Sequence, residues 1–363
     1  MELTTLWFIL IAFLWVGYFV LEGFDFGVGI LMPIIGRNEP ERRAVIATIG
    51  PVWDGNEVWV LVAGGATFAA FPEWYATLFS GFYLPLFLIL VALIIRGVAF
   101  EYRGKRPEAE WRRRWDAAIF VGSLLPAILW GVAFANIVAG VPIDANHEFT
   151  GDLFTLLNPY GLLGGVTTLG LFVTHGAVFL ALKSTDELRA RANGVAWIAG
   201  LATAVVAVAF LAWTQQQRGD AASLVVSALA AVALVGAIVA NRLRREGWAF
   251  IGTALTIILA VVALFVALFP DVMPSSTDPA NSLTTTNAAS TPYTLSIMTV
   301  VAVVFTPLVL IYQGWTYWVF RRRVSVSTSP TGDEHGEVGT PPPVAPPPAE
   351  GPPPARLAPR DAP

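Results

Sequence analysis

The chain has 363 residues, of which 55% are hydrophobic and only 13% are charged, with a formal net charge of −4. A soluble domain carries about 25% charged residues, so this composition is not that of a soluble domain and indicates a polytopic helical membrane protein. The chain has no cysteine and only three histidines. Thiolate clusters and disulfides are therefore excluded, and the chain is a poor host for a redox metal of its own.

Long apolar runs recur along the chain and predict about nine transmembrane helices. The first run has no small-residue cleavage signal, so it is interpreted as a retained span rather than a signal peptide. The predicted spans are 5–35, 44–70, 75–100, 116–140, 159–182, 194–214, 221–241, 247–269 and 293–320.

Basic residues lie on one side of these spans. Every Lys and Arg except Arg218 lies in or beside alternate connections, or in the C-terminal segment. The positive-inside rule therefore predicts that the N-terminus is outside and the C-terminus is cytoplasmic. Residues 1–323 are expected to form the transmembrane domain. Residues 324–363 are rich in proline and are expected to be a disordered cytoplasmic tail.

Four carboxyl groups interrupt the first two spans, namely Glu22, Asp25, Asp54 and Glu57. A carboxylate at the centre of a membrane helix costs about 2.5–3.5 kcal/mol, so each of them requires a reason. The members of each pair are three residues apart and share a helix face. Because the two spans are antiparallel neighbours, both pairs are predicted to converge near mid-membrane.

These acids favour a proton relay that is reached from the cytoplasm, because carboxyl groups in a low-dielectric bundle can be protonated near neutral pH. Asn56 and Thr48 are candidates to help carry a water chain. One alternative is a structural polar cluster that fixes helix packing. Another is a cation site, since four carboxylates without a partner cation favour protons only weakly over sodium.

Further candidates lie close to this region or carry rare side chains. Trp59 either lines the relay or packs between helices, and packing is the simpler reading. Arg96 is expected to extend to the interface, whereas Glu101 either marks the cytoplasmic mouth of the path or is a surface residue. His175 is interpreted as a packing residue in preference to a haem or quinone contact.

Several motifs together identify a family. GFDFGVG, PVWDGNEVW, FSGFYLPL, RGVAFEYR, LLNPYGLLGG and MPSSTDPANSLT resemble subunit II of cytochrome bd quinol oxidase, and the resemblance covers residues 1 to about 323. It implies a multi-pass protein of the bacterial cell membrane, built as two four-helix bundles plus one peripheral helix. It also implies an obligate partner, subunit I, which holds the three haems (two b-type and one d-type), while this chain binds no haem or metal itself.

The resemblance further implies a complex that oxidises quinol and reduces dioxygen to water with protons from the cytoplasm. By position, Asp54 and Glu101 resemble the proton-pathway acids, with Trp59 beside them. Glu22 and Asp25 match the family's other buried acidic pair, and Glu57 occupies a position at which the family varies. A bound quinone and small accessory subunits stay open.

Two rival functions use the same residues. A stand-alone proton- or ion-coupled transporter would use these acids for its own substrate, but such proteins usually show paired broken helices in inverted repeats, and no repeat is evident. The other rival is a purely structural partner of subunit I.

Overall fold

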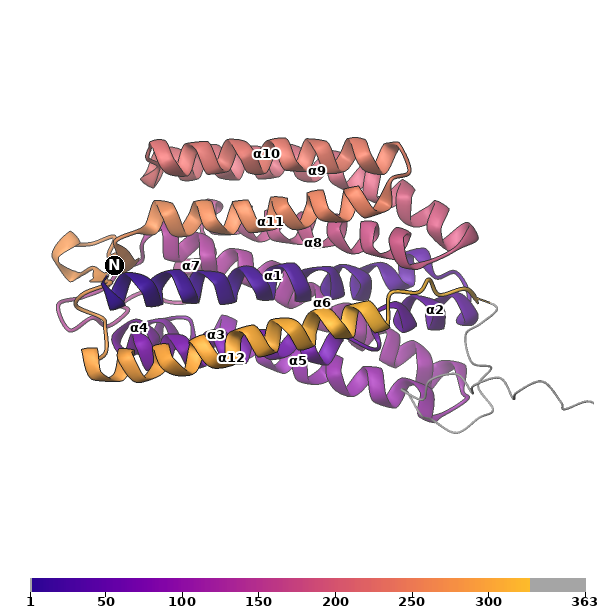
Figure 1. The fold of residues 1–363 in the computed structure, drawn as a ribbon, viewed down its shortest axis with the longest axis horizontal. Helices are drawn as coiled ribbons and strands as arrows, with labels where there is room; N and C mark the ends of the chain where they lie inside the picture. Colours follow the sequence, from indigo (N-terminus) through magenta and orange to yellow (C-terminus); the bar gives the residue numbers. More distant parts are fainter. Residues whose placement is uncertain (1, 327–363) are drawn as a thin grey trace, which may run out of the picture.

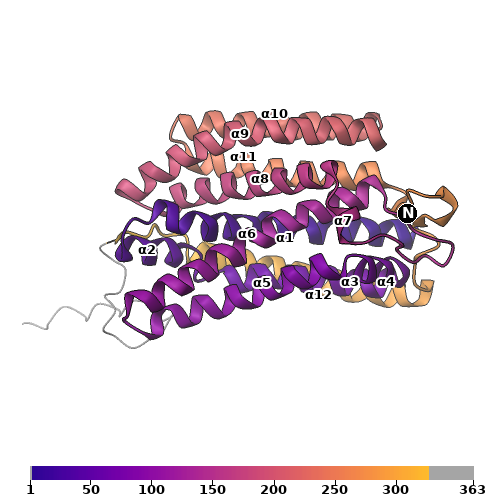
Figure 2. The same ribbon diagram turned by 180° about the vertical axis from the view of Figure 1, so that it is seen from behind.

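The structure, a computed structural model, describes residues 2–326. The predicted proline-rich tail at 324–363 therefore lies almost entirely outside the described residues. Long helices dominate the fold and run side by side (Figures 1 and 2). They are α1 (Leu3–Ile35), α3 (Trp53–Ala70), α5 (Tyr83–Tyr102), α6 (Ala109–Ala139), α8 (Pro159–Lys183), α9 (Asp186–Arg218), α10 (Ala221–Arg242), α11 (Glu246–Leu268) and α12 (Pro292–Val319).

Shorter elements connect them. These are α2 (Glu39–Ile49), α4 (Pro72–Gly81), α7 (Leu153–Leu156), the 3-10 helices η1 (Arg103–Lys105) and η2 (Pro279–Asn281), and the strands β1 (Asp271–Met273) and β2 (Leu283–Thr284), which pair antiparallel. Among the described residues, eight helices are long and apolar enough to cross a membrane: all the long helices except α3. An all-α membrane protein is therefore confirmed.

The span predicted at 44–70 consists of two helices. The chain forms α2, breaks at Gly50–Val52, and resumes as α3. Proline lacks a backbone N–H and its ring clashes with the carbonyl group four residues earlier, so Pro51 ends the first segment. The 18 residues of α3 include Asp54, Asn56 and Glu57, which explains why α3, unlike the other long helices, has no 18-residue segment apolar enough for a candidate membrane span.

The helix predicted at 75–100 is also divided. Its first part belongs to the short helix α4, and α5 begins after Phe82. Pro85 lies in the first turn of α5 and cannot donate to the carbonyl group of Gly81, so the helix restarts there. The apolar segment that could cross a membrane consequently runs from Tyr83 to Lys105.

Helix α1 is the centre of the packing, since it contacts α3, α6, α8 and α11. The closest approach is to α8, where a Cβ atom on Gly27 would lie only 2.0 Å from the carbonyl oxygen of Phe172. Gly176 meets the backbone of Gly27 in the same way. By contrast, α12 lies along α1 and α3 (Figure 1), and Leu295 is its only buried residue among those described.

The two ends of the helix stack differ in chemistry. At the loop end lie the N-terminus and the connections 140–158 and 269–291 (Figure 1), which are joined by a bridge between Val141 and Ser275. At the opposite, ionic end lie α2, η1, the α8–α9 and α10–α11 turns, and the end of α12. There Arg103 and Arg42 both pair with Asp116.

Candidate functional site

Glu22 and Asp25 lie on α1, beyond its middle and toward its C-terminal end, and both are fully buried. The segment GFDFGVG around them packs closely enough against α8 to exclude lipid. The predicted buried pair is therefore present on the inner side of α1. Because both side chains lie in an apolar interior, each needs a partner that compensates for lost hydration.

Arg96 of α5 is the partner of Glu22. It is fully buried, donates from Nη1 to Glu22 Oε1, and lies 3.6 Å from Glu57 Oε2. Its guanidinium carbon sits 4.8 Å from the ring centre of Phe26 and 5.3 Å from that of Phe100. The expectation that Arg96 extends to the interface is wrong, as is the inference that the carboxylates lack a partner cation.

Two features of the sequence direct Arg96 inward. It lies six residues before the end of α5, so its side chain starts too deep in the helix stack to reach water easily. On the facing helix α6, Gly122 provides the space, since a Cβ atom there would lie 2.7 Å from Cβ of Arg96. The signal that could have identified Arg96 was the excess of carboxyl groups, because buried ionisable groups pair with one another.

Asn56 of α3 joins three helices at this site. Its Nδ2 donates to Asp25 Oδ2 at 2.7 Å, and its Oδ1 accepts from Gln313 Nε2 and from the Tyr317 hydroxyl, both at 2.8 Å. Helices α1, α3 and α12 are therefore connected through one amide. Thr48, the other residue expected to help carry water, donates to the carbonyl oxygen of Val45 on its own helix.

Glu22, Asp25, Glu57 and Arg96 form one group, which we call the acid cluster. Several of its buried atoms have no hydrogen-bond partner within the described part of the chain: Glu22 Oε2, Asp25 Oδ1, Glu57 Oε2, and Arg96 Nε and Nη2. Such groups in protein interiors typically bind ordered water, which makes about three hydrogen bonds. The acid cluster can therefore hold both water and protons.

Asp54 and Glu101 do not join the acid cluster. Asp54 is exposed near the start of α3, and its Oδ1 accepts from the backbone N–H of Gly55. Glu101 is exposed near the end of α5. The predicted convergence of all four acids thus applies to three of them, because α3 turns Asn56 and Glu57 inward and Asp54 outward. Trp59 packs on α1, where a Cβ atom on Gly17 would lie 2.1 Å from its ring.

His175 has the surroundings of a packing residue. Its Nδ1 lies 2.7 Å from Thr253 Oγ1, and its Nε2 lies 3.2 Å from the carbonyl oxygen of Val20. The ring stacks on Phe250 with centres 4.7 Å apart. Both ring nitrogens are therefore engaged by protein atoms. Within residues 2–326 no group of three or more His, Asp or Glu side chains is arranged to hold a metal ion.

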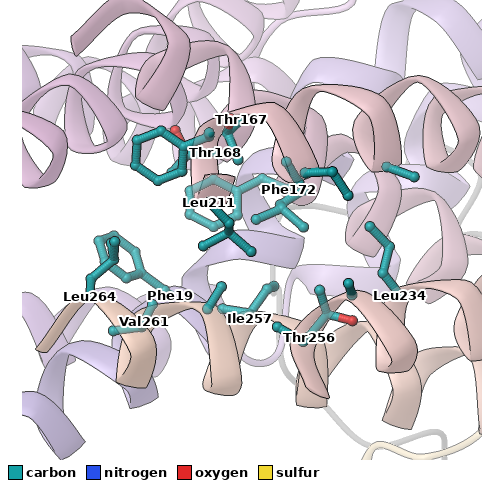
Figure 3. A pocket seen from close by; sticks show the side chains of 18 of the residues that line it. Phe19, Thr167, Thr168, Phe172, Leu211, Leu234, Thr256, Ile257, Val261 and Leu264 are labelled. Atoms are coloured by element: carbon teal, nitrogen blue, oxygen red, sulfur yellow. The ribbon is translucent and has the colours of Figure 1, made fainter. Parts of the chain in front are cut away.

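Several apolar cavities lie near these helices. A groove of about 590 Å³ runs between α1, α3 and α12 from Trp7 to Gln313, so one of its ends lies beside Asn56. A smaller cavity of about 90 Å³ lies among α8, α9, α10 and α11. Figure 3 shows that its wall consists of hydrocarbon side chains such as Phe172 and Leu264, with threonines as the only labelled polar residues. Neither cavity is lined by an ionisable group of the acid cluster.

Comparisons with known proteins agree over nearly the whole described chain. The family described as "Cytochrome bd terminal oxidase subunit II" matches residues 3–320. The chain is 44% identical to cytochrome bd ubiquinol oxidase subunit 2 of Bacillus subtilis (strain 168), covering 89% of this chain and 97% of that protein. It is 38% identical to cytochrome bd-I ubiquinol oxidase subunit 2 of Escherichia coli (strain K12), covering 88% and 94%.

A solved structure has the same fold. A chain of the bd oxidase from Geobacillus thermodenitrificans superposes with a TM-score of 0.74 at 17% sequence identity, covering 88% of this chain and 99% of that one.

Proposed function

The chain belongs to the cytochrome bd terminal oxidase subunit II family, and on this basis we propose that its acid cluster supplies cytoplasmic protons to a haem-bearing partner. The chain is subunit II of a bd-type oxidase, a multi-pass membrane protein whose complex is a quinol oxidase. The stand-alone transporter considered from the sequence is thereby set aside. The remaining question is the function of this subunit within the complex.

The partner is subunit I, and in this proposal it holds all three haems, two b-type and one d-type, and the site of dioxygen reduction. The side chains of this subunit support that division of labour. His175 has both ring nitrogens engaged, and the chain offers no cysteine as a ligand. Small accessory subunits and a bound quinone stay predictions; the groove between α1, α3 and α12 has the apolar walls that a quinone ring would need.

The membrane arrangement that goes with this function has nine spans, with α3 as the ninth. Helix α3 has 18 residues, which at 1.5 Å per residue gives about 27 Å, close to the thickness of the hydrocarbon core. We place the N-terminus outside and the ionic end in the cytoplasm, following the arginines. The spans then form two four-helix bundles, α1, α3, α5 and α6 on one side and α8 to α11 on the other, with α12 peripheral.

The surface formed by α3 and α12 is proposed to be covered by subunit I. Val58 and Leu61 on α3 and nearly all of α12 are exposed. Asp54 lies on the same exposed helix, and a carboxylate that faces lipid is costly to insert. A protein partner would remove that cost by offering hydrogen bonds, so we place Asp54 at the contact with subunit I.

The observation that carries the proposal is the acid cluster itself. Glu22 and Glu57 both pair with the guanidinium group of Arg96, and Asp25 is buried beside Glu22 on the same face of α1. The break between α2 and α3 lies on the ionic side of this cluster, and Asp54 follows the break directly. A proton that enters at the ionic end therefore meets Asp54 before it reaches the carboxyl groups of the acid cluster.

The test is Asp54→Asn in the intact complex, with Glu73→Gln as the matched control, because Glu73 is an exposed acid on α4 toward the loop end. We expect Asp54→Asn to slow oxygen-consuming turnover by about tenfold or more while haem content stays normal. Glu73→Gln should leave both unchanged. Normal turnover in Asp54→Asn would contradict the proton supply and favour a purely structural subunit.

A further inference from the structure

The acid cluster has more carboxyl groups than positive charges. Glu22 and Asp25 from α1, Glu57 from α3 and Arg96 from α5 meet in one place, and the first two and Arg96 are fully buried. The other packed elements add no fixed charge. Helix α6 offers Gly122, α12 offers the hydroxyl group of Tyr317, and α1 offers Tyr18, which accepts from Trp130. Asp54 is exposed and lies outside the cluster.

Charge balance limits which protonation states are accessible. A guanidinium group does not lose its proton in proteins. Uncompensated charge in an apolar interior is far more costly than a neutral group, and a buried carboxyl group takes up a proton instead. The favoured resting state therefore has one carboxylate against Arg96 and two protonated carboxyl groups. The geometry then decides which acid is the charged one.

Glu22 has the contact that a carboxylate needs. Arg96 Nη1 donates directly to Glu22 Oε1. Glu57 lies 3.6 Å from the same nitrogen atom and makes no hydrogen bond through its Oε2. Of the three carboxyl groups, Glu22 is therefore the one held by a charge-assisted hydrogen bond.

Asp25 has a neutral hydrogen-bond donor and no ion pair with Arg96. Asn56 Oδ1 is occupied by Gln313 and Tyr317, so the amide must present its NH₂ group to Asp25. Asp25 Oδ2 accepts this bond from a neutral group, while Oδ1 has no hydrogen-bond partner among residues 2–326 and is available to carry the proton that compensates for the missing cation.

We propose that Arg96 is a positioning residue that fixes the negative charge on Glu22 and thereby leaves Asp25 and Glu57 as the two groups that hold exchangeable protons. This inference deepens the proposed function and rests on it only for the use made of those protons. The division of charge itself follows from the contacts of Arg96 and Asn56.

The test is infrared difference spectroscopy of the intact complex in H₂O and D₂O, reading the C=O bands of protonated carboxyl groups. Arg96→Gln should add one band, because Glu22 then takes up a proton. The charge-neutral double variant Glu22→Gln with Arg96→Gln should restore the wild-type bands. Replacing Asp25 with Asn, or Glu57 with Gln, in the Arg96→Gln background should each remove one wild-type band and keep the new band from Glu22.

Two results would overturn the assignment. One is that Arg96→Gln adds no band, and the other is that the double variant Glu22→Gln with Arg96→Gln lacks a wild-type band. Haem content identifies variants that fail to assemble, and the charge-neutral pair keeps the test available if Arg96→Gln alone does not fold. Oxygen consumption is a separate measurement. In it the charge-neutral double variant should turn over several-fold faster than Arg96→Gln. If Asp54→Asn proves harmless, the proposed function fails while the band pattern still decides the role of Arg96.

Discussion

Among single residues, Asn56 links more of the structure than any of the acids predicted from the sequence. It binds Asp25 of α1 on one side and Gln313 and Tyr317 of α12 on the other. Helix α12 has few other contacts with the rest of the chain, so this amide ties a peripheral helix to the acid cluster. The stability of the fold and the chemistry of the site therefore depend on the same side chain.

Replacing Asn56 with leucine keeps the volume but removes both hydrogen-bonding groups. Three partners lose a bond, and each buried polar group left unsatisfied costs about 1–3 kcal/mol. We expect a complex that melts several degrees lower and consumes oxygen more slowly. Thermal melting and oxygen consumption measure the two effects, and a variant that melts and turns over like the wild type would show that Asn56 does not join α12 to the cluster.

The sequence identified the buried carboxyl groups but not their partner. Glu22 and Asp25 could be predicted because their cost in a membrane is high and their spacing puts them on one face. Arg96 was assigned to the interface because long basic side chains often extend there. Its inward direction depends on Gly122, which is distant in sequence. The outward direction of Asp54 depends on the rotation of α3 after the break at Pro51, which spacing alone does not give.

At the scale of helices, the contact between α1 and α8 brings two backbones close together. Gly27 faces the carbonyl group of Phe172 at a distance that leaves no room for a Cβ atom. The acid cluster lies on α1 next to this contact, so its geometry depends on how closely α8 approaches.

Gly27→Ala is therefore expected to push α1 and α8 apart and to lower the yield and melting temperature of the complex. Gly236→Ala on α10 is the matched control, because nothing lies within 4 Å of its added Cβ atom. Alanine there should be neutral or stabilise the helix by about 0.5–1 kcal/mol. Equal melting temperatures for the two variants would contradict the close approach.

Helix α2 is held at the ionic end by charge. Its Asn38 cap accepts from the backbone of Glu41, and the Glu41 carboxylate lies 2.7 Å from Arg191 of α9. The hydrogen bond from Arg191 lowers the pKa of Glu41 below its ordinary value of 4.5. A carboxyl group whose pKa is lowered by folding stabilises the folded state at pH values above its ordinary pKa. This stabilisation is lost as the pH falls through the lowered pKa.

The melting temperature of the wild-type complex should therefore fall when the pH is lowered from 7 to below 4.5, the ordinary pKa of Glu41. Glu41→Gln should melt lower at neutral pH and lose less on acidification. Glu187→Gln, an exposed acid at the same end, serves as the control and should follow the wild type. Identical pH profiles for Glu41→Gln and the wild type would show that this ion pair does not anchor α2.

For the whole molecule, the fold class and the family were accessible from sequence, since hydropathy and the motifs around Asp25 and Asp54 are local features. The division of the second and third spans was not, because the effect of Pro51 and Pro85 depends on how the neighbouring helices compensate for lost hydrogen bonds. Helix α3 is also too polar to be a candidate span by the composition of the helix itself, because it carries Asp54, Asn56 and Glu57, of which Asn56 contacts α1 and Glu57 contacts α5.

The subunit purified on its own should show no haem absorbance, because His175 is fully engaged and no cysteine is present. Co-expression with subunit I should give haem absorbance in the complex. Haem bound in stoichiometric amounts to the isolated chain would place a redox centre here and contradict the division of labour between the subunits.

The central claim, that protons for dioxygen reduction pass through the acid cluster, is tested most directly by proton uptake in the reconstituted oxidase. Complexes carrying Asp25→Asn would be placed in liposomes, and uptake from the cytoplasmic side would be timed after a single reaction with dioxygen. The proposal predicts that proton uptake and oxygen consumption slow by the same factor while haem content and haem reduction by quinol stay normal. Wild-type proton uptake in Asp25→Asn would contradict it.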